Sequence, residues 1–146
     1  MPLKEKNYIE EINKLTEKDW KPLLDLILEM EKADSFGEMH MPHVKEENVF
    51  SMPFWEGNEL VDRFLKLVED IPLMIQFDWG SWEDGFEMLR SENFNFDTVD
   101  IPTKCKLITL IVRKERFVEG SLKEAFDSGQ MLRILTSIKN QLGERD

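Results

Sequence analysis

Residues 107–135, with the sequence LITLIVRKERFVEGSLKEAFDSGQMLRIL, form the densest apolar stretch of the chain. A charged run, RKER at residues 113–116, interrupts this stretch near its middle. The apolar residues before the run, together with Phe117 after it, surround most of a helical wheel, which predicts a central helix that is buried on several sides. The only polar strip through the middle of that helix consists of Thr109, Arg113 and Arg116. Lys114 and Glu115 project into sectors of the wheel that are otherwise apolar, so we expect either that the helix ends near the charged run or that these two charged side chains extend out to solvent.

Capping residues and helical spacing of apolar side chains predict further helices on both sides of this stretch. Thr16 and Asp19 mark one start, either together as a capping box or with Asp19 alone as the N-cap. Asn58 and Asp100 are the expected N-caps of two more helices. Ser121 is the expected N-cap of a short helix that precedes the last one.

These patterns predict a mainly α fold, a compact single-domain bundle of about six to seven helices. Gly and Pro residues interrupt the apolar pattern near residues 35–57, which indicates a long irregular loop. Residues 73–77 are expected to form an extended connector. We expect acidic N-terminal helices over residues 1–70 and the helical core of the domain over residues 71–142.

The charge of the chain is unevenly distributed. Residues 1–102 hold 10 Lys and Arg against 24 Asp and Glu, whereas residues 103–146 hold 9 against 6, and the formal net charge is -11. This acidity argues against nucleic acid as a partner. The single cysteine, Cys105, and the absence of a signal-like or membrane-spanning apolar run predict a soluble cytoplasmic protein.

Recognised reaction motifs are missing from the sequence. It contains no Gly-rich phosphate loop, no HExxH or paired-cysteine metal spacing and no GxSxG elbow. Residues 39–43, Met-His-Met-Pro-His, have side chains that suit a soft metal, but such a segment is more typical of a plain loop. We expect no metal site and no cofactor.

A candidate ligand-binding site surrounds the charged run. Its residues are Asp78, Trp79, Trp82, Arg113, Arg116 and Glu119. Arg113 and Arg116 lie three residues apart, so their guanidinium groups can converge on one carboxylate or phosphate. The structural alternative is an ion-pair network with Asp78, Glu83 or Asp84.

Several short segments in the second half of the chain form a recognisable pattern. They are FDW at 77–79, Trp82, Gly85, LIT at 107–109, RKERFVEG at 113–120, Phe126, Ser128, Gly129, Ile134 and Leu135. The pattern resembles domain-of-unknown-function family 6508, a group of small, largely bacterial proteins, over roughly residues 71–142. Val118 stands where many relatives have a cysteine, which argues against shared thiol chemistry.

Three functional hypotheses follow. The first is a non-catalytic interaction or regulatory domain whose partner is an unknown protein or a small anionic ligand. The second is an Asp/Trp/Arg cleft that binds an anion or supports hydrolysis. Asp78 and Glu119 are its candidate acid and base, because the aromatic residues and turns beside them are expected to bury their carboxyl groups. The third is a weak helix-turn-helix over residues 122–138, in which only Arg133 and Lys139 offer phosphate contacts from the second helix.

Overall fold

The computed structural model describes residues 3–40 and 54–143, and the predicted mainly α architecture is confirmed. The described residues form seven α-helices, a two-stranded sheet and two short 3-10 helices. In chain order these elements are α1 (Leu3–Asn13), α2 (Glu17–Glu31), β1 (Gly37–His40), β2 (Phe54–Gly57), α3 (Glu59–Asp70), η1 (Trp79–Ser81), α4 (Glu83–Arg90), η2 (Phe96–Thr98), α5 (Ile101–Lys114), α6 (Ser121–Asp127) and α7 (Gln130–Gly143).

Three of the predicted N-caps are confirmed by hydrogen bonds at the helix starts. The two alternatives for α2 resolve to a capping box, with Thr16 as the N-cap and the Asp19 carboxylate accepting from the Thr16 N–H at 2.9 Å. These hydrogen bonds lower the pKa of the Asp19 carboxyl. Asn58 accepts from the first turn of α3, and Asp100 accepts from Thr103 N–H at 2.9 Å. Each cap satisfies amide groups that have no partner within the helix.

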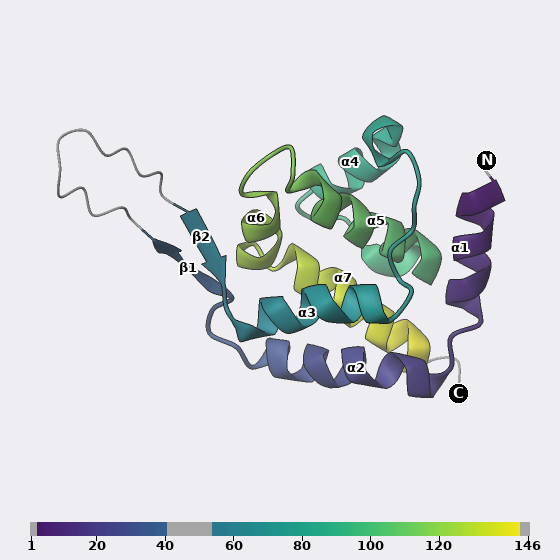
Figure 1. The fold of residues 1–146 in the computed structure, drawn as a ribbon, viewed down its shortest axis with the longest axis horizontal. Coiled ribbons are helices and arrows are strands. Elements are labelled where there is room, and N and C mark those ends of the chain that lie inside the picture. Colours follow the sequence, from purple (N-terminus) through teal and green to yellow (C-terminus); the bar gives the residue numbers. More distant parts are fainter. Residues whose placement is uncertain (1–2, 41–53, 144–146) are drawn as a thin grey trace.

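α5 occupies the centre of the fold, as the apolar stretch predicts. It packs against α1, α4, α6, α7 and η1, and it ends at Lys114 inside the charged run. In Figure 1, α2 and α3 run side by side, and α7 passes between this pair and α5. The buried apolar residues of all these layers form one continuous core. No helix of the described residues is both long and apolar enough to cross a membrane.

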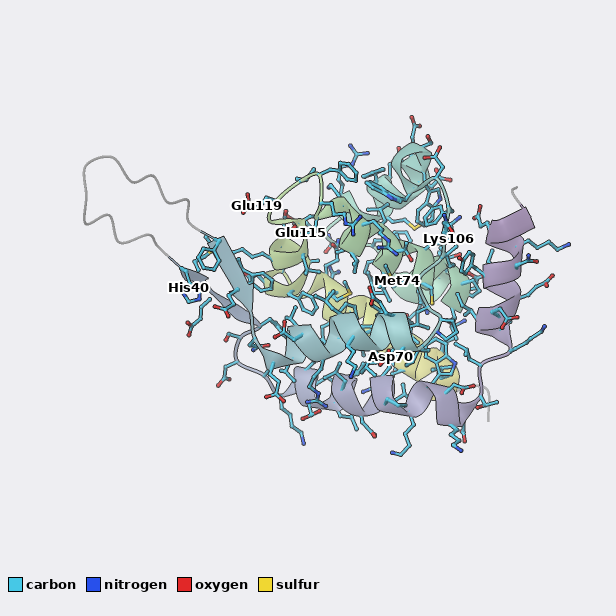
Figure 2. The ribbon with its side chains drawn as sticks, viewed as in Figure 1. His40, Asp70, Met74, Lys106, Glu115 and Glu119 are labelled. Carbon is cyan, nitrogen blue, oxygen red and sulfur yellow. The ribbon has the colours of Figure 1, made fainter. Side chains whose placement is uncertain are left out.

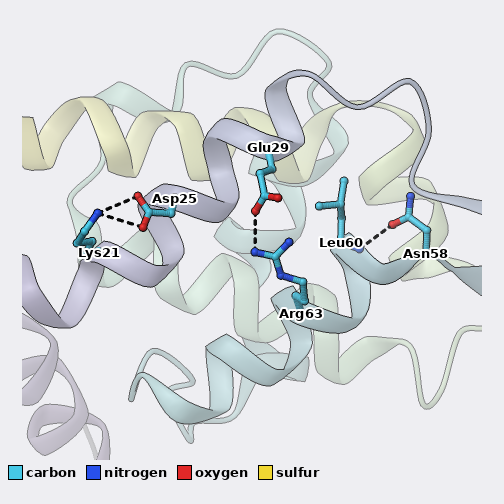
Figure 3. A network of polar contacts seen from close by, with 6 residues as sticks. All are labelled: Lys21, Asp25, Glu29, Asn58, Leu60 and Arg63. Carbon is cyan, nitrogen blue, oxygen red and sulfur yellow. Dashed lines mark hydrogen bonds and ion pairs between the residues drawn. The ribbon is translucent and has the colours of Figure 1, made fainter.

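A polar contact reinforces the packing of α2 on α3. Figure 3 shows Arg63 of α3 reaching Glu29 of α2, with its Nη2 2.6 Å from the carboxylate. This hydrogen bond lowers the pKa of the Glu29 carboxyl. Both side chains remain partly exposed, so the pair adds little to the stability that the apolar contacts provide.

The prediction of an irregular loop near residues 35–57 is wrong at both ends of that segment. β1 and β2 pair there as an antiparallel sheet that extends from the helical body (Figure 1), with Met39 opposite Trp55. A Cβ atom on Gly37 would lie 2.5 Å from the Trp55 ring, so this glycine permits the close approach. Each strand has only four residues. An alternating pattern this short does not stand out in a sequence.

The start of α6 also differs from the prediction. Gly120, not Ser121, is the N-cap residue, and its φ of 94° lies in the left-handed region that favours glycine. Its missing side-chain cap is supplied by Glu115, whose carboxylate accepts from Gly120 N–H at 3.1 Å and from Leu122 N–H at 3.3 Å. A negative charge at a helix N-terminus is favourable because unpaired amide groups point toward it. Part of the charged run therefore has a structural role.

Candidate functional site

A cleft opens beside the polar strip of α5. It has a volume of about 290 Å³. Four elements form its walls: α1, the connector after α3, η1, and α5 with the turn that follows it. The lining residues are Tyr8, Met74, Ile75, Gln76, Phe77, Trp79, Thr109, Arg113 and Arg116. The cleft thus contains all three residues of the predicted polar strip and one of the two predicted tryptophans.

Thr109 positions the connector that forms one wall. Its buried hydroxyl donates to the carbonyl oxygen of Cys105 at 2.8 Å and accepts from Ile75 N–H at 3.0 Å. Leu73 and Ile75 alternate into the core, so the intervening Met74 and the following Gln76 lie on the cleft side. Residues 74–76 form a connector without helix or strand, Leu73 lies in the turn before it, and a buried hydrogen bond joins the connector to α5.

The two arginines stay on one side of the chain although α5 ends between them. The Arg116 N–H donates to the Arg113 carbonyl oxygen at 3.3 Å, which continues the helical turn past Lys114. Both side chains are exposed. Among the described residues, no carboxylate oxygen lies within 4.0 Å of either guanidinium group.

The predicted ion-pair network with Asp78, Glu83 or Asp84 is therefore wrong for the described part of the chain. These three acidic residues are exposed at the surface around η1 and the start of α4. Their carboxylates remain hydrated there, and long-range attraction between exposed charges is weakened by solvent and salt. The positive charge of the cleft is consequently not neutralised by these neighbours.

α1 is held against the body of the protein by the largely buried ammonium group of Lys106. Lys106 Nζ pairs with the Glu5 carboxylate at 2.7 Å, and it lies 4.7 Å and 4.6 Å from the ring centroids of Phe77 and Trp82. In Figure 2, Lys106 lies on the side of the molecule that faces α1. The same docking places the Tyr8 hydroxyl 3.4 Å from the Gln76 amide oxygen, to which it donates.

Three of the six predicted site residues do not line this cleft. Trp82 packs edge-on against Phe77 and under Lys106, behind the cleft wall. Asp78 and Glu119 are exposed, and Figure 2 places Glu119 at the turn between α5 and α6. The burial on which the acid and base hypothesis depended is therefore absent at both carboxylates.

The sequence interpretation missed Lys106 and Tyr8. The spacing of the sequence could have indicated Lys106. It lies three residues before Thr109 and seven before Arg113, so it extends the polar strip of the helix by one turn. The position of Tyr8 was not available, because α1 reaches the cleft only through tertiary packing.

A larger cavity of about 990 Å³ lies between α4, α5, α6 and the start of α7. Its basic side chains already contact the protein. Lys114 Nζ lies 5.6 Å from the Phe86 ring centroid, Arg133 donates to the carbonyl oxygen of Glu92 at 3.0 Å, and Arg90 Nε donates to the carbonyl oxygen of Phe86. An anionic ligand would have to compete with these contacts, which favours the smaller cleft as the candidate site.

The helix-turn-helix hypothesis loses support in the structure, and the candidate metal segment is only partly described. Arg133 donates to the Glu92 carbonyl oxygen and Lys139 pairs with Glu31. Both basic residues named for the helix-turn-helix hypothesis therefore contact the protein itself. His40 stacks on Phe54 and lies 2.7 Å from the Glu56 carboxylate. Residues 41–43 of the candidate metal segment lie outside the described residues.

Comparison with known proteins identifies the family of the chain. No curated protein and no solved structure gives a significant match. A family model described as a family of unknown function, DUF6508, matches residues 15–144. The match extends well beyond residues 71–142, where the resemblance was recognised, and it includes every cleft residue except Tyr8. The chain therefore belongs to family DUF6508.

Proposed function

We propose that this single-domain protein is a non-catalytic binding module that recognises a compact anionic group, a carboxylate or a phosphate, in the Arg113 and Arg116 cleft. The observation that carries the proposal is the pair of guanidinium groups one helical turn apart, which have no carboxylate partner among the described residues. Arginine is well suited to this task because its planar group binds such anions through two parallel hydrogen bonds.

The other polar groups of the cleft support an anionic ligand over a cationic one. The donor hydrogen of the Thr109 hydroxyl is committed to the Cys105 carbonyl oxygen, and the same hydroxyl accepts from Ile75 N–H. The Tyr8 hydroxyl donates to the Gln76 amide oxygen, which leaves the Gln76 amide N–H groups as further donors toward the cleft. Over residues 3–40 and 54–143, no carboxylate lines the cleft. Donors thus dominate its walls.

A non-catalytic role is supported by the positions of the acidic residues. Asp78 and Glu119 are exposed and neither lines the cleft, so neither residue of the predicted acid and base pair faces a group bound there. We also propose a cytoplasmic location, which is supported by the free, buried thiol of Cys105.

The proposal is tested by titration calorimetry with sodium acetate and sodium phosphate at constant ionic strength. We expect saturable binding of at least one of these anions. Arg113→Gln and Arg116→Gln are each expected to weaken that binding by about 10- to 100-fold, because a hydrogen bond to a charged group contributes about 1.5–3 kcal/mol.

The matched control is Arg63→Gln, which makes the same change of charge on α3, outside the cleft. This variant should bind the anion as the unaltered protein does. Circular dichroism confirms that all three variants are folded. Binding that survives both cleft substitutions, or that Arg63→Gln abolishes equally, would overturn the proposal because the affinity would then reflect overall charge.

A further inference from the structure

An aromatic surface lies directly beside the cleft. The ring centroids of Trp79 and Phe117 are 5.8 Å apart, with an interplanar angle of 46°. Trp79 lines the cleft, whereas Phe117 is 75% exposed and follows Arg116 in the chain. The next residue, Val118, is 49% exposed. A large aromatic side chain left in water at the edge of a donor-rich cleft is a recognisable feature of binding surfaces.

The size of the cleft limits what it can enclose. A volume of about 290 Å³ is at the lower end of the range for small-molecule sites. The head of a ligand that contacts both guanidinium groups fills the polar part of this space. Any larger portion of the ligand then extends along Trp79, the residue that belongs both to the cleft and to the aromatic surface.

We infer that the ligand is an aromatic anion, an aryl carboxylate or an aryl phosphate, whose ring packs on Trp79 and Phe117 while its charged group binds Arg113 and Arg116. This inference rests on the proposed function, since it requires anion binding at the arginines. A flat ring matches the surface because aromatic pairs gain stability from offset or edge-to-face contacts beyond the area they bury. Arginine side chains beside the ring add a cation–π contribution.

The charged group of the ligand and its aromatic ring each contact different residues of the site. The carboxylate or phosphate oxygens accept hydrogen bonds from the two guanidinium groups. The ring gains contact with Phe117, whose present exposure means that ligand binding removes apolar surface from water. An inorganic anion or an aliphatic carboxylate can accept the hydrogen bonds from the guanidinium groups. It cannot make the contact between aromatic rings at Phe117.

The experiment compares benzoate and phenyl phosphate with cyclohexanecarboxylate, acetate and inorganic phosphate by titration calorimetry. Benzoate and cyclohexanecarboxylate have similar sizes and the same charged group, so their difference reports the aromatic ring. We expect at least one aryl probe to bind about two- to tenfold more tightly than its non-aromatic counterpart. The comparison of benzoate with phenyl phosphate distinguishes a carboxylate ligand from a phosphate ligand.

The decisive variant is Phe117→Leu, which keeps an apolar side chain and removes the ring. It should lower aryl affinity by about two- to tenfold and leave acetate or phosphate binding unchanged. Phe54→Leu makes the same change at another exposed phenylalanine, 52% exposed on β2, and should alter neither. Because Phe117 is so exposed, melting temperatures should show that the variant folds normally.

The outcomes separate this inference from the proposed function. Equal affinity for aryl and non-aromatic anions, or aryl binding that Phe117→Leu does not weaken, would overturn the aromatic ligand alone. Absence of binding for all five probes would overturn both. Binding of an acidic protein segment with no affinity for any aryl probe would also exclude the aromatic ligand.

Discussion

Cys105 is buried within α5, where its side chain is 0% exposed. Burial raises the pKa of its thiol to about 12, because the negatively charged thiolate would lose its hydration there. The folded protein therefore keeps this thiol protonated at pH values where an unfolded cysteine is partly ionised. The thiolate is the reactive form of cysteine. Burial therefore protects Cys105 from chemical modification in two ways, because it keeps reagents away from the sulfur and keeps the thiol protonated.

We predict that Cys105 in the folded protein reacts with a thiol reagent at pH 8.5 more than about 100-fold more slowly than in the unfolded protein, since most native cores open rarely. Absorbance of the released chromophore in buffer and in guanidinium chloride measures the two rates. Equal rates would show that the thiol is accessible in the native state, contrary to its position in α5.

At the scale of secondary-structure elements, the turn between α5 and α6 depends on the Glu115 carboxylate. α6 begins after a glycine that offers no side-chain cap, and Glu115 supplies the acceptor instead. This residue was predicted only as a charge in an otherwise apolar sector of the helix. The helix-ending signal was correct, but a reach of five to seven residues along the chain was not visible in the pattern.

We predict that Glu115→Ala lowers the free energy of unfolding by about 1 kcal/mol, the usual cost of losing a helix N-cap. Urea denaturation followed by circular dichroism measures the change. Glu119→Ala is the matched control, since Glu119 is exposed on the same turn (Figure 2) and should change stability by less than about 0.5 kcal/mol. Similar losses in both variants would show that Glu115 does not act as the cap.

At the scale of the whole molecule, α1 contributes one wall of the cleft from the far end of the chain, through Tyr8. It lies outside the matched family region of residues 15–144, yet Glu5 is only 8% exposed and pairs with Lys106. Lys106 in turn contacts Phe77 and Trp82, so one cation joins the first helix, the connector and the segment around η1. The cleft wall formed by Tyr8 depends on this junction.

We predict that Glu5→Gln lowers the free energy of unfolding by about 1–3 kcal/mol, because a largely buried ammonium group loses its charged partner. Amide hydrogen exchange in α1 should accelerate by about five- to 100-fold, as measured by mass spectrometry.

Asp25→Asn is the comparison, since it breaks an exposed pair with Lys21 (Figure 3). It should change stability by less than about 0.5 kcal/mol. Unchanged exchange in α1 of Glu5→Gln would mean that apolar packing alone holds the helix.

The arrangement of the cleft explains why half of the candidate site was predictable. Trp79, Arg113 and Arg116 were found because aromatic and charged residues near an apolar helix are visible in a sequence. Asp78 and Glu119 were chosen for their neighbours in the chain, but their side chains turn out to be exposed. Phe117 was counted among the buried apolar residues of the helix, whereas the end of α5 at Lys114 leaves it in water.

The sequence by itself determined the helices, the caps at Asn58 and Asp100, and the apolar character that buries α5, while it left two alternatives for the cap at the start of α2. These features depend on contacts between residues three or four apart, so periodicity and residue type are sufficient to predict them. Only the tertiary structure decided the pairing of β1 with β2, the junction of Glu5 with Lys106 and the cleft itself. Each joins residues far apart in the chain, and their proximity results from the packing of the whole core, which no local pattern encodes.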